Sequence, residues 1–211
     1  MGQLVAETIR LYGERFFGAL PLGLPIAALD AVAFDRTLQA QTVLLWAFAP
    51  AVTASYVWAS ARVCDVSLTP RTAAVALAVG LVVFLPFPVL YRIFILPGLA
   101  LFALVGLAVP AAVCEGLGLR AALRRGLELG RVDFVHALGG LATLVLVYAL
   151  SRYALLFLLR TQSDQTQRVA GFLADLVLAP LLFLGSALLY YDQAARWAVR
   201  RDRGRMASSV R

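Results

Sequence analysis

The sequence predicts an all-α fold, a polytopic membrane helical bundle of six transmembrane helices with short amphipathic interfacial helices on the cytoplasmic side. Of the 211 residues, 62% are hydrophobic and only 15% are charged, and the mean hydropathy is +0.84. A soluble domain of this length could not bury so much apolar surface in one core, so lipid must solvate much of it. Apolar runs of about 20 residues, the length that crosses the hydrocarbon core, recur along the chain.

Six such runs define the predicted spans, which cover about 17–34, 41–61, 72–91, 94–113, 134–157 and 169–191. They form a single integral membrane domain over 1–195, followed by a basic cytoplasmic tail over 196–211. The third and fourth spans are nearly continuous, and only Arg92 within PFPVLYRIFILPG marks a turn between them. The alternative is one span plus a re-entrant segment, which would change the parity of the topology.

The distribution of arginine favours six spans over five, because the cytoplasmic flanks of membrane helices accumulate positive charge. With six spans and a cytoplasmic N-terminus, 14 of the 19 basic residues lie on the cytoplasmic side. They are Arg10, Arg15, Arg62, Arg71, Arg120, Arg124, Arg125, Arg131, Arg196, Arg200, Arg201, Arg203, Arg205 and Arg211. We therefore expect a protein of the bacterial cytoplasmic (inner) membrane with both termini in the cytoplasm.

The stretch VPAAVCEGLGLRAALRRGLELGR, residues 109–131, combines a helical pattern with high charge. At about 100° per residue, the arginines fall on one side of the helix and most apolar residues fall on the other. The segment is too charged to span a membrane, which favours an interfacial helix over a solvated loop. We expect its arginines to face anionic lipid headgroups and its glutamate to reach Arg124 or Arg125. The residues of this basic helix are Glu115, Arg120, Arg124, Arg125 and Arg131.

The N-terminal segment predicts a second, milder amphipathic helix. Its acidic and basic residues Glu7, Arg10 and Glu14 lie opposite an apolar side. That apolar side consists of Leu4, Val5, Ile9, Leu11 and Tyr12.

Arg152 and Asp175 are charged residues within the last two predicted spans, in VYALSRYALLF and GFLADLVLAP. A lone charge in mid-membrane costs about 3 kcal/mol or more, so each of them needs a partner. The turn between these spans is expected near residues 163 and 164, about equally far from both. An antiparallel hairpin therefore brings them to one depth, near the outer side, where they can form an ion pair. The structural role is a clamp on the hairpin, and the functional alternative is a proton or ion relay.

The sequence contains no motif that indicates catalysis, a metal or cofactor site, or nucleic-acid binding. Cys64 and Cys114 lack a CxxC pattern with histidine partners, so we expect two free thiols. His136 is the only histidine, which favours an interfacial anchor over a catalytic group. Ser186 in LGSALL lacks the flanking glycine pattern of a membrane serine protease, and DQAAR at 192–196 lacks the glycine of the DGxxAR motif of lipid phosphotransferases. We therefore predict a protein that is not an enzyme.

The run VPAAVCEGLGLRAALRRGLELGRVDFVHALGGL, residues 109–141, resembles a bacterial membrane-domain family found attached to glycerophosphoryl diester phosphodiesterases and as stand-alone proteins. The shared pattern is a span ending in Pro and Glu, then Ala-Leu-Arg-Arg, then Glu-Leu, then an aromatic residue that opens the next span. Gly126 stands where a serine is common in the family. In members that are enzymes, the resemblance implies that phosphodiester chemistry resides in a separate soluble barrel with metal-binding carboxylates and histidines. No such region occurs in this sequence, so the resemblance implies a stand-alone accessory module.

These observations predict a non-enzymatic integral membrane module with a scaffolding, regulatory or lipid-associated role. Its expected partners are membrane lipids, with anionic headgroups at the cytoplasmic face, and a second membrane protein. The alternative is a small transporter or flippase-like protein in which Arg152 and Asp175 line a pathway. A continuous polar cavity that reaches this pair favours the transporter, whereas tight packing favours the module.

Overall fold

The computed structural model describes residues 2–14 and 16–209, and within them it leaves out the side chains of residues 2, 3, 5, 91–93 and 202–209. Two arginines of the predicted topology, Arg15 and Arg211, lie outside the described residues. The side chains of Arg92, Arg203 and Arg205 also lie outside this description. All regular structure within the described residues is helical.

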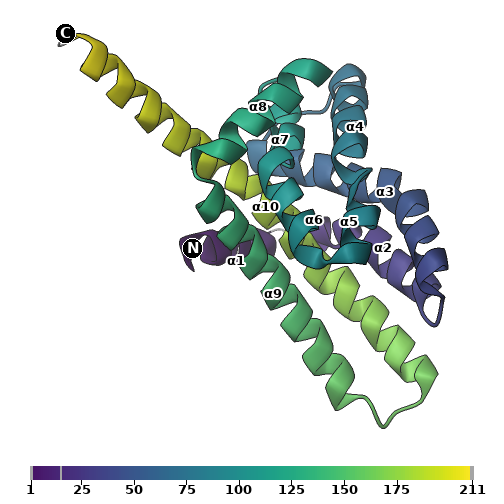
Figure 1. The fold of residues 1–211 in the computed structure, drawn as a ribbon. Helices are drawn as coiled ribbons and strands as arrows, with labels where there is room; N and C mark the ends of the chain where they lie inside the picture. Colours follow the sequence, from purple (N-terminus) through teal and green to yellow (C-terminus); the bar gives the residue numbers. More distant parts are fainter. Residues whose placement is uncertain (1, 15, 210–211) are drawn as a thin grey trace.

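The chain folds into a bundle of helices packed along one long C-terminal helix, and the end of this helix projects from the bundle (Figure 1). In order, the helices are α1 (Gly2–Glu14), α2 (Phe16–Ala33), α3 (Leu38–Cys64), α4 (Pro70–Phe84), α5 (Phe87–Ile93), α6 (Ile95–Val105), α7 (Ala108–Cys114), α8 (Leu119–Val132), α9 (Phe134–Leu158) and α10 (Asp164–Ser209).

Within the described residues, six helical segments are long and apolar enough to cross a membrane, which confirms the predicted all-α polytopic bundle. They are Phe16–Ala33, Leu38–Cys64, Pro70–Leu90, Ile95–Cys114, Phe134–Leu158 and Asp164–Arg201. The third segment continues from α4 into α5, and the fourth from α6 into α7. Between them Phe94 is extended, with φ −170° and ψ 150°, and it ends α5 close to the turn that the sequence places at Arg92. The third and fourth spans are therefore two separate segments.

Side-chain caps explain where several of these helices begin. Thr37 Oγ1 accepts a hydrogen bond from Ala40 N at 3.3 Å, and Thr69 Oγ1 accepts one from Thr72 N at 3.2 Å. Such caps satisfy backbone N–H groups that have no partner within the first turn of a helix. The turns after α2 and α3 are thus encoded locally, and they return the chain toward the bundle.

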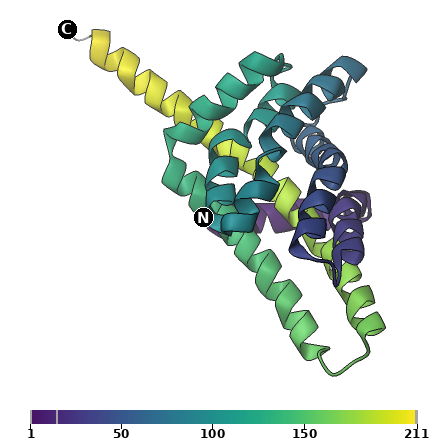
Figure 2. The same ribbon diagram turned by 45° about the vertical axis from the view of Figure 1, so that its right-hand side comes forward.

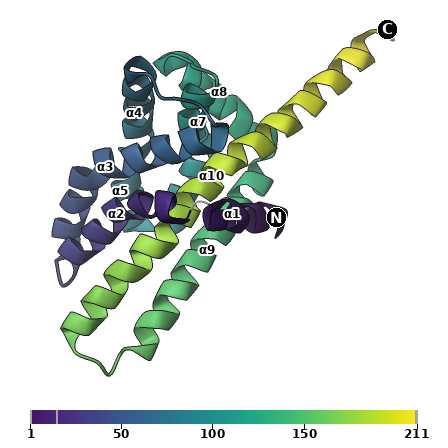
Figure 3. The same cartoon turned by 180° about the vertical axis from the view of Figure 1, so that it is seen from behind.

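Helix α10 is the element on which most of the bundle packs. It contacts α1, α2, α3, α8 and α9, and it crosses the whole structure in all three views (Figures 1, 2 and 3). At Gly23 the backbones of α2 and α10 nearly touch, because a Cβ atom there would lie 2.3 Å from the carbonyl oxygen of Leu176. Beyond residue 196, the predicted start of a tail, α10 continues without a break to Ser209 and extends away from the bundle.

An aromatic cluster fills the centre of the core. The side chain of Tyr56 on α3 is fully buried, and its hydroxyl donates a hydrogen bond to the Gly106 carbonyl at 3.2 Å. The rings of Phe84, Phe102 and Phe183 lie around it, with centroids 5.5 to 6.5 Å away. Tyr56 therefore joins α3 to α4, α6 and α10, and its polar end supports the break between α6 and α7.

Cys64 and Cys114 form a disulfide, so the prediction of two free thiols is wrong. Cys64 is the last residue of α3 and Cys114 the last of α7, and their Cα atoms lie 5.7 Å apart. This distance is within the range in which disulfides form. The two cysteines are 50 residues apart in sequence, and only the packing of α3 against α7 brings them together.

The disulfide predicts how many thiols react in the purified protein. Protein purified in air and denatured without reductant should take up no maleimide-polyethylene glycol, because both sulfur atoms are in the bond. After reduction the same protein should take up two polymer chains, one for each cysteine in the sequence. The measurement is the shift in gel mobility.

A Cys64→Ser variant is the control, and it should take up one polymer chain with or without reductant. Two chains on the unreduced parent protein would contradict the disulfide.

Candidate functional site

Arg152 on α9 forms ion pairs with carboxylates on two neighbouring helices. Its Nε lies 3.0 Å from Asp175 Oδ1 on α10, and its Nη2 lies 2.6 Å from Asp30 Oδ2 on α2. The contact between Arg152 and Asp175 that the hairpin register predicts is therefore present. Because three helices contribute one residue each, this charged cluster joins α2 to the hairpin of α9 and α10.

Asp175 is the most deeply buried member of the charged cluster. Its side chain is only 1% exposed, compared with 16% for Arg152 and 35% for Asp30. Tyr148 on α9 donates a hydrogen bond from its hydroxyl to Asp175 Oδ1, the oxygen that also accepts from Arg152. The second oxygen, Oδ2, is buried and has no hydrogen-bond partner among the described residues. A buried acceptor without a donor is uncommon in folded proteins and points to an additional interaction.

A cavity of about 540 Å³ opens onto the charged cluster, and we call it the polar chamber. It lies between α2, α3 and the hairpin of α9 and α10, at the end of the bundle where α2 turns into α3. Its size is in the range of small-molecule sites in proteins. Its polar lining residues include Asp30, Asp35, Gln41, Tyr148, Arg152 and Asp175.

A second cavity of about 330 Å³ lies deeper in the bundle, and we call it the apolar chamber. Its walls come from α2, α3, α6, α9, α10 and the α4–α5 junction, and all of its lining residues are apolar except Tyr148 and Ser186. The two chambers share five lining residues, so they are adjacent and no helix lies between them. The shared residues are Ile26, Leu29, Leu45, Val145 and Tyr148.

Sequence reasoning identified only part of this site. Asp30 lies inside the first predicted span, so the rule that singled out Arg152 and Asp175 applies to it equally. Tyr148 has no comparable signal, because a tyrosine in an apolar helix is ordinary. The chambers have no signal in the sequence at all, since their walls come from segments far apart in the chain.

The predicted basic segment forms α8, and its apolar side packs on the protein. At Gly126 a Cβ atom would lie 2.5 Å from the backbone nitrogen of Ala108, so α8 and α7 are in backbone contact. Glycine is needed there because any side chain would push the helices apart. The buried residues of α8 are Ala122, Gly126, Leu129, Gly130 and Val132. The exposed arginines are Arg120, Arg124 and Arg131.

Glu115, in the loop before α8, accepts two hydrogen bonds. Arg125 Nε donates to its Oε1 at 2.9 Å, and the Tyr190 hydroxyl of α10 donates to the same atom at 2.6 Å. The Arg125 guanidinium carbon also lies 4.3 Å from the ring centroid of Trp197. Of the two predicted partners of Glu115, Arg125 is the one in contact, whereas Arg124 pairs with Glu128 at 2.9 Å.

His136, predicted to be an interfacial anchor, belongs to a third polar cluster at the start of α9. Its Nε2 lies 3.2 Å from Asp192 Oδ2, and Arg196 pairs with both Asp192 and Asp133. Asp133 also caps α9, because its Oδ1 accepts from His136 N at 3.2 Å. These contacts hold the start of α9 against α10, which is a structural role. Among the described residues no group of three or more His, Cys, Asp or Glu side chains is arranged to hold a metal ion.

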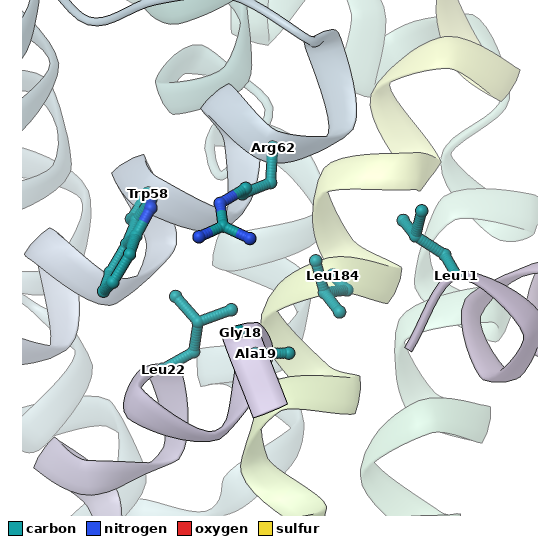
Figure 4. Close-up of a pocket in the computed structure, with 7 residues that line it drawn as sticks. All are labelled: Leu11, Gly18, Ala19, Leu22, Trp58, Arg62 and Leu184. Carbon is teal, nitrogen blue, oxygen red and sulfur yellow. The ribbon is translucent and has the colours of Figure 1, made fainter. Parts of the chain in front are cut away.

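Arg62 lines a much smaller hollow between α1, α2, α3 and α10 (Figure 4). Its guanidinium carbon lies 5.2 Å from the Trp58 ring centroid and its Nη1 contacts the position where a Cβ of Gly18 would be. The hollow measures about 10 Å³, which is room for one water molecule at most. It is therefore a packing defect beside a cation–π contact, and not a ligand site.

Removing Arg152 should destabilise the protein more than removing Arg152 and Asp175 together. An Arg152→Ala change leaves the Asp175 carboxylate buried without its cation, which costs about 3–5 kcal/mol for buried pairs. An Asp175→Ala change added to it removes the uncompensated charge, so the double variant should recover part of the lost melting temperature. Thermal unfolding in detergent measures this, and a double variant no more stable than Arg152→Ala would contradict the clamp.

A larger residue at position 126 should detach α8 from the bundle. A Gly126→Val change puts three carbon atoms where the Ala108 backbone lies, so we expect a loss of about 2 kcal/mol or more. Faster backbone amide exchange in α8 and a lower melting temperature would report it. Ala121→Val is the matched control, because it adds a valine at an exposed position of the same helix, and it should change both measurements much less.

Comparisons with protein-family models, with curated proteins and with solved structures find no match to this chain.

Proposed function

We propose that this protein is a non-enzymatic membrane module that holds one lipid-like amphiphile, with the apolar chain in the apolar chamber and the polar end in the polar chamber. The observation that carries the proposal is the adjacency of the two chambers, which share Tyr148 and four apolar residues. A site with one apolar and one charged end matches an amphiphile better than it matches a polar solute. The resemblance to a membrane-domain family associated with phosphodiester enzymes supports a lipid-related role.

The linings argue against a hydrated pathway through the bundle. A pathway for protons or ions needs polar side chains or water along its whole length. The polar chamber reaches Arg152 and Asp175, but beyond Tyr148 the lining becomes apolar except for the Ser186 hydroxyl. The transporter alternative keeps one observation in its favour, the opening at the charged cluster. Movement of a fluorescent phospholipid between leaflets of proteoliposomes would support that alternative.

The arginine distribution supports the proposed orientation, in which α8 and both termini lie in the cytoplasm of a bacterial cell. The exposed Arg120, Arg124 and Arg131 would then lie near anionic headgroups, each contributing about 1 kcal/mol of attraction. The Cys64–Cys114 bond lies on this same side, where cellular reductants keep thiols reduced. Because 14 of the 19 basic residues support this orientation, we infer that the bond forms only under oxidising conditions.

Filling the apolar chamber should abolish binding of an apolar chain. Ala49 lines this chamber from α3, and an Ala49→Phe change would place a ring in the volume that a chain would occupy. We expect a pyrene-labelled hydrocarbon chain to bind the variant at least about tenfold more weakly than the parent protein, measured by fluorescence in nanodiscs.

Ala51→Phe is the matched control, because Ala51 lies on the same helix and is exposed. It should bind the probe as the parent protein does. Equal binding by the Ala49→Phe variant, with an unchanged melting temperature, would contradict a chain in the apolar chamber.

A further inference from the structure

The polar chamber has more carboxylates than cations around it. Asp30, Asp35 and Asp175 line the polar chamber, and Arg152 is the one basic residue among its lining residues. Arg168 lies close by and pairs with Asp35 at 2.7 Å. Three carboxylates therefore face two guanidinium groups, which leaves one negative charge without a matching cation.

The unmatched charge coincides with the unpaired oxygen. Arg152 is shared between Asp30 and Asp175, at 2.6 and 3.0 Å, so one cation serves two carboxylates. Asp175 lines the chamber with a side chain that is only 1% exposed, and its buried Oδ2 has no donor among the described residues. A buried carboxylate oxygen is stabilised when a charged donor reaches it. The chamber thus offers an acceptor and a negative charge at the same point.

An anionic head would not fit this arrangement. Two nitrogen atoms of Arg152, Nε and Nη2, already pair with carboxylates. An anion that took the place of Asp30 or Asp175 on Arg152 would leave the displaced carboxylate without its cation. A neutral head with a hydroxyl group could satisfy Oδ2 but would leave the negative charge unmatched. The chamber therefore selects against anions, because its carboxylates repel them.

We propose that the polar chamber binds the cationic, hydrogen-bond-donating head of an amphiphile, a primary amine or a similar ammonium group, between Asp30 and Asp175. This inference rests on the proposed function, because the apolar chamber must hold the chain. The ammonium group donates to Asp175 Oδ2 and lies near Asp30, and Tyr148 and Arg152 keep the Asp175 carboxylate in place through Oδ1.

The test compares three amphiphiles with the same chain, hexadecylamine, hexadecanol and hexadecanoate. Each displaces the pyrene-labelled chain from the full-length protein in phosphatidylcholine nanodiscs, and displacement in protein-free nanodiscs is subtracted. We expect the amine to bind at least about tenfold more tightly than the alcohol, because a charge-assisted hydrogen bond is stronger than a neutral one. Hexadecanoate should bind more weakly than the alcohol.

Two variants locate the preference in the charged end. Asp175→Asn and Asp30→Asn should each reduce the preference for amine over alcohol to less than about threefold. Asp30 is 35% exposed, so its variant tests the inference even if the Asp175 variant does not fold. Asp35→Asn is the matched control, because Asp35 has its own cation in Arg168 and its variant should keep the preference.

The outcomes separate the two proposals. If none of the three amphiphiles displaces the probe from the parent protein, or the probe itself does not bind, the proposed function fails. If the alcohol and the amine bind equally well, or the preference survives in both Asp30→Asn and Asp175→Asn, the cationic head is excluded while the chain site remains.

Discussion

The need to pair a buried carboxylate organises the half of the bundle that contains the polar chamber. Asp175 is nearly inaccessible on α10, and a charge at such a position is expensive unless cations and donors surround it. Its partners come from α9, which supplies Arg152 and Tyr148, and Arg152 in turn binds Asp30 of α2. Next to Asp175 the backbone of Leu176 lies against Gly23 of α2. One residue therefore fixes the positions of three helices relative to one another, and the polar chamber lies where they meet.

The opposite half of α10 is held by a cluster of the same chemical composition. There a carboxylate, Glu115, accepts hydrogen bonds from an arginine, Arg125, and from a tyrosine, Tyr190. These residues join α10 to α8 and to the loop after α7, close to the disulfide between α3 and α7. Both clusters are directional because hydrogen bonds require geometry, whereas the apolar contacts between them are not.

The two polar clusters hold α10 at two positions along its length, and this affects the packing of the region between them. Helices that are held by polar clusters and by close backbone contacts do not need to pack tightly along their whole length. The apolar chamber lies in this intermediate region, and Phe84, Phe102 and Phe183 of the aromatic cluster form part of its wall. A membrane protein can keep such a chamber at low cost when an apolar chain occupies it, because lipid tails are as apolar as the side chains that line it. The adjacent polar chamber then determines which head group is accepted.

The sequence by itself determined the class of fold, the six spans and, for the first five spans, the approximate positions of their ends. Hydropathy reflects the solvent that each segment requires, and threonine caps and prolines act within a few residues, so these features can be read locally. It also determined the contact of Arg152 with Asp175, because two residues about equally far from one turn must meet in a hairpin. The same reasoning about buried charge applies to Asp30 but does not identify its partner.

Only the tertiary structure decided the rest of the site. The proximity of Asp30 to Arg152, the pairing of Cys64 with Cys114, the choice of Arg125 over Arg124 by Glu115, and both chambers depend on helices distant in sequence. Apolar helices of similar composition can pack in many arrangements, since nonpolar contacts are not specific in direction. Which residues face each other across the bundle is settled by small close-contact residues such as Gly23 and Gly126 and by a few buried polar groups, and their partners are defined only when the helices are assembled.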